Sequence, residues 1–228
     1  MAAAPTNSAG RYAHIDALRA LAVSIVVVGH AGVPMMPGDT GVTIFFVISG
    51  FIITHLLLRE RERTGGFNIR RFYARRALKL APPFLVLIIV PTLIFALTQP
   101  ISWPAFGSQI LFSYNWAQIW FPEAAWLVLP GSNVTWSLAV EEQFYIVFAI
   151  IWLLFVRRRW WLPALTGLAC AAIVASGLIR MSLYFGGDNA LHILRGTDTR
   201  MESIAWGILA AIAYKLWRDR PDRIAARL

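Results

Sequence analysis

A histidine deep within an apolar segment, with an arginine eleven residues before it, is the feature of this chain best suited to chemistry. The segment begins at Arg19 and ends at His30, and nearly every residue between them has a hydrocarbon side chain. On a helix, eleven steps of about 100° place both residues on one face, about 16 Å apart along the axis. Ionisable groups are costly inside a membrane and commonly mark a functional path. We therefore predict a polar track along this segment.

The imidazole of His30 has more than one possible role. A neutral imidazole accepts a proton near neutral pH, so it could act as a general base on a hydroxyl group. It could equally act as a nucleophile, or it could bond a neighbouring helix and hold a bundle together. The alignment with Arg19 favours a catalytic role, and the residues alone leave base and nucleophile open.

Two adjacent acids, Glu141 and Glu142, interrupt another apolar segment and are followed by Gln143 and Tyr145. Adjacent helical residues point about 100° apart, so at most one of the two carboxylates faces squarely into a shared cavity. Such a carboxylate could orient His30 or stabilise its protonated form. The alternative is that either acid reaches the membrane surface and has no further role.

A basic cluster contains Arg75, Arg76 and Lys79. Guanidinium groups match phosphate oxygens, so the cluster could hold a phosphorylated cosubstrate. It could also set the topology and attract anionic lipids.

Smaller polar signals lie elsewhere in the apolar segments. Ser49 and Gly50 form a small pair where helices can approach closely, and Ser49 could also line the polar track. Asp198 and Arg200 could bind an acceptor, or they could pair with one another and with Glu202.

The composition predicts a membrane protein with several spans. Hydrophobic residues make up 58% of the 228 positions, charged residues only 14%, and the mean hydropathy is +0.60. Seventeen of the 21 lysines and arginines lie in four short blocks beside apolar stretches, which is typical of cytoplasmic loops. No basic stripe with interleaved aromatic residues is present, so nucleic-acid binding is excluded. The single cysteine, Cys170, excludes an intramolecular disulfide, and no Cys/His spacing indicates a metal.

The chain is therefore expected to fold as an all-α transmembrane bundle, one integral membrane domain over residues 1–228. The charge blocks place both termini in the cytoplasm. Residues 108–130, rich in tryptophan and proline, are predicted to form an interfacial or re-entrant segment. About six apolar stretches are long enough to span a membrane: 15–33, 41–58, 80–97, 135–156, 162–185 and 201–216.

Five blocks in this order carry a family resemblance: Asp16 to His30, Gly41 to Phe51, Arg75 to Pro82, Trp136 to Tyr145, and Asp198 to Gly207. Together they resemble the acyltransferase 3 family, whose membrane-bound members O-acylate carbohydrates and related cell-surface molecules. The chain departs from the family at Thr43, where many members have an acid, and at Lys79, where an arginine is usual. Lysine keeps the charge but loses the planar fork.

The resemblance implies transfer of an acyl group, most readily acetyl, from acyl-coenzyme A to a hydroxyl of a carbohydrate or glycolipid. Arg75, Arg76 and Lys79 would bind this cosubstrate, and Arg19 would guide the thioester toward His30. Glu141 would support the charge on His30. We expect no permanently bound cofactor or metal. Four further side chains are expected to contact substrate: Ser49, Glu142, Asp198 and Arg200.

The resemblance also implies a multi-pass protein of the inner membrane, in contact with lipids. Family members usually have more spans than this chain, which is expected to be a shortened or partial member. Two alternatives stay open at this point. One is a transporter or channel with a polar His, Arg and Glu track, and the other is an inactive fragment or partner.

Overall fold

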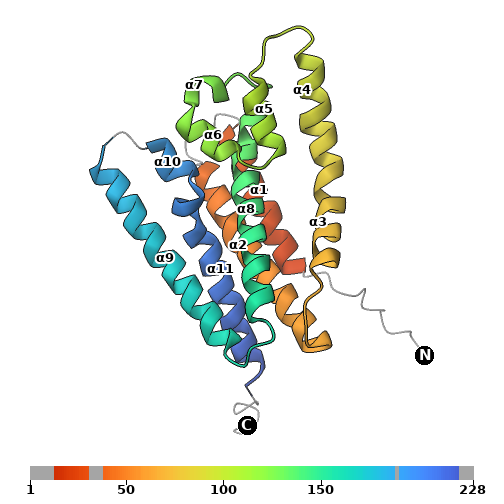
Figure 1. Ribbon diagram of the computed structural model, residues 1–228, viewed down its shortest axis with the longest axis vertical. Helices are drawn as coiled ribbons and strands as arrows, with labels where there is room; N and C mark the ends of the chain where they lie inside the picture. Colours follow the sequence, from red (N-terminus) through yellow and green to blue (C-terminus); the bar gives the residue numbers. More distant parts are fainter. Residues whose placement is uncertain (1–12, 31–37, 188–189, 221–228) are drawn as a thin grey trace, which may run out of the picture.

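The computed structural model describes residues 13–30, 38–187 and 190–220, and within these ranges every regular element is a helix (Figure 1). The long elements are α1 (Ala13–His30), α2 (Gly38–Thr64), α3 (Ile69–Phe84), α8 (Thr135–Phe155), α9 (Trp161–Phe185) and α11 (Thr197–Arg218). The short elements are α4 (Val90–Phe95), α5 (Trp103–Ile110), α6 (Tyr114–Trp120), α7 (Pro122–Ala125), η2 (Ser132–Val134) and α10 (Ala190–Arg195). The prediction of an all-α bundle is confirmed.

One long rod is built from three of these elements. Helix α3 contains Pro82 and Pro83, passes into a π-helical stretch, η1 (Leu85–Ile89), and continues as α4. Proline has no N–H to donate and clashes with the preceding turn, so the hydrogen-bond ladder changes register after the pair. The rod stays long enough to cross a bilayer.

Four helical segments have the length and composition of a membrane span: Asp39–Thr64, Ile69–Phe95, Ser132–Phe155 and Trp161–Phe185. The apolar part of α1, Ala17–Gly29, is shorter, and α11 is not among the four. The expected number of about six spans is therefore not confirmed. The chain has the helices of a membrane protein, and each of the six predicted apolar stretches overlaps one of the long helices or the α3–α4 rod.

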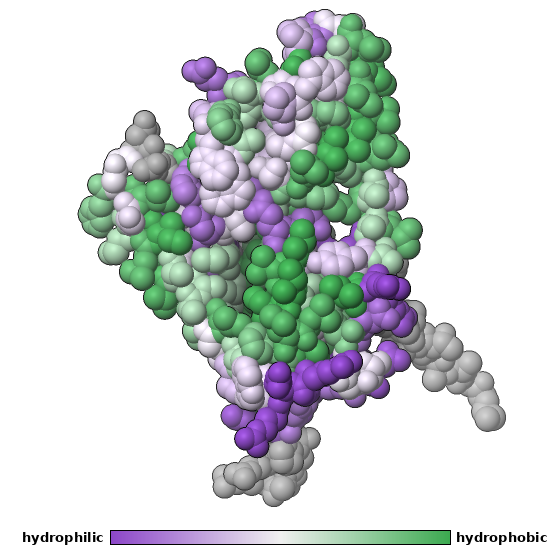
Figure 2. Space-filling model, in the orientation of Figure 1, coloured by the Kyte–Doolittle hydropathy of each residue, from purple (hydrophilic) through white to green (hydrophobic). Residues whose placement is uncertain are grey.

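The two ends of the bundle differ. At one end α2, α8 and α11 finish and α3 and α9 begin, and hydrophilic side chains gather there (Figure 2). We call this the basic end, because it contains residues 59–71, 157–159 and 215–220. At the opposite end lie α5, α6, α7 and α10 (Figure 1). Thus most of residues 108–130 form short helices here, rather than one long span.

The α2–α11 contact is the tightest in the bundle, because glycine lets the two backbones touch. A Cβ atom added to Gly50 would lie 2.1 Å from the carbonyl oxygen of Ile204. One added to Gly207 would lie 2.1 Å from the carbonyl oxygen of Val47. The close approach predicted at the Ser49–Gly50 pair is confirmed, and it fixes Ser49 against the neighbouring α8.

Candidate active site

A cavity of about 630 Å³ lies between α1, α2, α3 and α8. It brings together residues that are far apart in the sequence. Helix α1 contributes Arg19, α3 contributes Arg76 and Lys79, and α8 contributes Glu141 and Tyr145. Four predicted site residues therefore face one space. The remaining lining is largely apolar: Ala20, Val23, Ser24, Phe45, Leu80 and Leu138.

Glu141 is held by two hydroxyl groups. The Ser49 hydroxyl of α2 donates to its Oε1, and the Tyr145 hydroxyl donates to the same oxygen at 2.5 Å. All three residues are buried. Burying a carboxylate is costly unless hydrogen bonds compensate, and bonds to a charged acceptor are strong. These two donors therefore fix the carboxylate at the wall of the cavity. Tyr145 lies one turn further along α8, and Ser49 lies on the neighbouring helix α2.

The neighbouring acid points elsewhere. Glu142 forms an ion pair with Arg76, and it does not line the cavity. This confirms that only one of two adjacent carboxylates can face the shared space. The Arg76 guanidinium also lies 3.3 Å from the centre of the Tyr145 ring, and its Nε is buried without a hydrogen-bond partner. Arg76 is thus anchored on one side and unsatisfied on the other.

Arg75 is placed differently from the other members of its cluster. Its side chain is half exposed and lies 3.6 Å from a carboxylate oxygen of Glu60. It does not line the cavity that Arg76 and Lys79 line. An exposed ion pair of this kind contributes little to stability. The structure therefore separates Arg75 from its predicted cosubstrate partners.

Helix α1 is continuous from Ala13 to His30, as predicted. Arg19 and Val23 both line the cavity, and the Nε of Arg19 is buried without a hydrogen-bond partner. The register of an unbroken helix puts position 30 on this same face, about three turns further on. The side chain of His30 itself lies outside the described residues.

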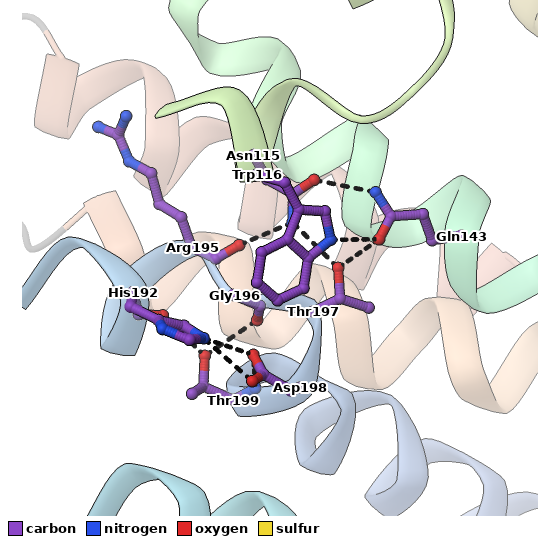
Figure 3. Close-up of polar contacts among 9 residues, drawn as sticks. All are labelled: Asn115, Trp116, Gln143, His192, Arg195, Gly196, Thr197, Asp198 and Thr199. Carbon is purple, nitrogen blue, oxygen red and sulfur yellow. Dashed lines mark hydrogen bonds and ion pairs between the residues drawn. The ribbon is translucent and has the colours of Figure 1, made fainter. Parts of the chain in front are cut away.

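Asp198 and Arg200 lie in the first turn of α11, which starts beside α10 at the end away from the basic end (Figure 1), and they do not line the cavity. They do not pair with one another. Both carboxylate oxygens of Asp198 lie close to Nε2 of His192, at 3.1 and 3.0 Å (Figure 3). Arg200 donates to the carbonyl oxygen of Leu194 at 2.6 Å and to the Thr43 hydroxyl at 3.2 Å. Thr43, which stands where many family members have an acid, therefore contributes a contact of its own.

A polar network that the sequence did not reveal connects α6, α8 and the joint between α10 and α11 (Figure 3). Gln143 is its centre. The Gln143 amide donates to Asn115 at 2.9 Å, and its oxygen accepts from Trp116 at 3.1 Å and Thr197 at 2.5 Å. Asn115 in turn donates to the carbonyl oxygen of Arg195 at 3.1 Å. The sequence signal available for this network was the presence of amide side chains in the 108–130 segment, and the structure shows that these side chains are buried.

These features define a helical membrane protein with a charged, open cavity lined by four helices and a polar network at one end. The chain belongs to the acyltransferase 3 family. The family's model, described as an acyltransferase domain, matches residues 12–227.

Curated relatives from Staphylococcus aureus carry a more specific name. The chain is 32% identical over 218 residues to the O-acetyltransferase OatA of strain NCTC 8325 and to that of strain COL. A second protein of strain COL, provisionally named an O-acetyltransferase, is 32% identical over 223 residues. Each match covers 91% of this chain and 36% of the relative, so the chain spans about a third of their length. No solved structure matches the chain.

Proposed function

We propose that the chain transfers an acyl group, most readily acetyl, from acyl-coenzyme A to a hydroxyl group of a carbohydrate or glycolipid. One observation carries the proposal: Arg19, Arg76, Lys79 and Glu141 come from three helices and line the same cavity. The names of the relatives support acetyl as the transferred group. The inner membrane and a cytoplasmic N-terminus are part of the same proposal.

The cations of the cavity suit an anionic donor. Arg76 and Lys79 lie within about three turns of the start of α3, at the basic end of the bundle. Lys79 forms no ion pair within the described ranges, and Arg76 has an unsatisfied Nε. Both could hold the phosphates of coenzyme A, because charge-assisted hydrogen bonds to phosphate are stronger than neutral ones. Arg19 would then stand between these phosphates and the thioester.

The reaction needs a base next to the thioester. In the proposed step, His30 takes the proton from the acceptor hydroxyl while the hydroxyl oxygen attacks the carbonyl carbon of the thioester. The thiolate of coenzyme A then leaves and is protonated. Glu141, fixed by Ser49 and Tyr145, would stabilise the positive charge that builds up on the histidine. General-base assistance is worth about 10² to 10⁴ in rate.

The test is release of the coenzyme A thiol by the purified chain in lipid vesicles. Wild-type protein is expected to release thiol from acetyl-coenzyme A only when a glycan with a free hydroxyl is present. The His30→Ala variant should lose at least about 10²-fold in rate while it stays in the membrane. Wild-type rates in this variant would remove the histidine from the mechanism, and thiol release without acetylated glycan would contradict transfer.

A further inference from the structure

A second charged site lies at the opposite end of the bundle from the basic end, around the indole of Trp136. The guanidinium carbons of Arg195 and Arg200 lie 5.7 and 5.8 Å from the centre of this indole. Arg195 also lies 5.1 Å from the ring centre of Trp126. Arg195, before Gly196, and Arg200, after it, therefore each lie near one buried tryptophan.

The carboxylates that lie nearby are occupied by other partners. Asp198 is paired with His192, and Glu202 is paired with Arg180. Neither Arg195 nor Arg200 forms an ion pair within the ranges that the structure describes. Asp39 is the described carboxylate whose charge acts on both arginines, from beyond ion-pair distance. The charge of Glu202 also acts on Arg200, whereas Asp39 is the described carboxylate whose charge acts on Arg195.

Arg195 is partly desolvated without compensation. Burial lowers the pKa of its guanidinium, and its Nη1 is buried with no hydrogen-bond partner. A cation in this condition gains more from an anionic partner than a fully hydrated one does.

The polar network holds this cation in place without using it. Asn115 binds the carbonyl oxygen of Arg195, and Figure 3 shows the guanidinium pointing away from the network. The following residue, Gly196, is closely packed, because a Cβ atom there would lie 2.4 Å from Oδ1 of Asp198 and 2.8 Å from the backbone carbonyl oxygen of His192. Gly196 N–H donates to the carbonyl oxygen of His192 at 2.8 Å, and Arg200 N–H donates to that of Gly196 at 3.0 Å, so the backbone here is already ordered, which reduces the entropic cost of binding.

We propose that Arg195 binds a carboxylate or phosphate group carried by the carbohydrate acceptor, while Trp126 packs against its sugar ring. That this carbohydrate is the acceptor rests on the proposed function, whereas the binding of an anionic sugar does not. Trp126 is 48% exposed, so part of its flat apolar surface is available beside the Arg195 guanidinium. A guanidinium fork recognises the planar carboxylate or the phosphate oxygens. A phosphate from a lipid headgroup offers the same chemistry, and the experiment below separates the two sources.

The experiment measures equilibrium binding to the whole chain in phosphatidylcholine nanodiscs, with no acetyl-coenzyme A present. The probes are glucuronate and glucose 1-phosphate, with glucose as the neutral control. We expect at least one of the two anionic sugars to bind about tenfold more tightly than glucose, because hydrogen bonds to charged groups are the stronger ones. Arg195→Gln should remove this preference, and Arg195→Lys should restore part of it.

Arg158→Gln is the matched control, since it removes the same charge from an exposed loop at the basic end. It should bind as the wild type does. Equal binding of all three sugars, or an unchanged preference in a folded Arg195→Gln variant, would overturn the proposal. Nanodiscs with phosphatidylglycerol supply the lipid arm: binding of this lipid alone, lost in Arg195→Gln, would assign the site to a headgroup and also overturn it. Because no transfer is measured, a failure of the proposed acyltransferase activity would leave this result unaffected.

Discussion

At the scale of single residues, the neighbouring cations of α3 offer a sharp comparison. Lys79 lines the cavity, whereas Arg75 lies on the outside beside Glu60. Lys79→Gln is expected to raise the KM for acetyl-coenzyme A about tenfold, because one charge-assisted contact to phosphate is lost. Arg75→Gln should leave KM within about twofold, since an exposed ion pair is worth little. Thiol release at a series of donor concentrations measures both, and the reverse order would place the donor outside the cavity.

The two hydroxyl groups that donate to Glu141 lead to a prediction for kcat, whereas the cations of α3 lead to one for KM. Tyr145→Phe removes one donor and keeps the ring that packs on Arg76. We expect kcat to fall roughly fivefold with KM unchanged, because a net hydrogen bond is worth about 1 kcal/mol and Glu141 is proposed to act on the reaction rather than on donor binding.

Ser49→Ala should act in the same direction, and the double variant should lose more than either single one. Tyr184→Phe is the control, because Tyr184 is 75% exposed on α9. An unchanged kcat in the double variant would make this pair of hydroxyls purely structural.

Spacing could not decide between the arginines of the basic cluster. Arg75 is four residues and Arg76 three residues before Lys79, and both separations place side chains on a common helix face. Arg76 faces the cavity because it pairs with Glu142 of α8. This contact joins residues that are 66 positions apart in the sequence. In contrast, Arg195 did have a sequence signal. It is one of four cations outside the basic blocks, with Arg19, Arg180 and Arg200.

At the scale of elements, the α2–α11 contact can be tested against a glycine with free space. A methyl group on Gly50 would collide with the backbone of α11, whereas nothing lies within 4 Å of one placed on Gly167 in α9. Gly50→Ala is expected to destabilise the bundle by about 1 to 3 kcal/mol through overpacking. Gly167→Ala should be neutral or stabilising, since alanine is the better helix former. Thermal unfolding in detergent compares them, and equal midpoints would mean that the helices can separate without cost.

The helices themselves could be predicted, because long apolar stretches leave the backbone no partner but itself in a membrane. The number of spans could not be settled in this way. Helix α11 begins with the polar run Thr197 to Glu202, which serves the network and the ion pair with Arg180. The network also joins Asn115, Gln143 and Thr197, whose separation along the chain hides their contact. Local pattern therefore determined the elements, and tertiary contacts determined the site.

At the scale of the whole molecule, the proposed reaction requires a definite orientation in the membrane. The donor cations begin about two turns into α3 from the basic end, so coenzyme A would enter from that side. The anion site around Trp136 lies at the opposite end. If the basic end faces the cytoplasm, as its charge predicts, donor and acceptor approach from different sides of the membrane.

Cysteine labelling in intact cells tests this orientation. In a Cys170→Ser background, Trp120→Cys, at an exposed position at the opposite end, should react with a membrane-impermeable maleimide added outside. A cysteine at Arg158, exposed at the basic end, should react only after the cells are opened. The inverted pattern would put Arg76 and Lys79 on the side that lacks coenzyme A. This result would exclude coenzyme A as the donor even if the cavity, the ion pair and the two hydroxyl groups were all as described, because coenzyme A in the cytoplasm could not reach these cations.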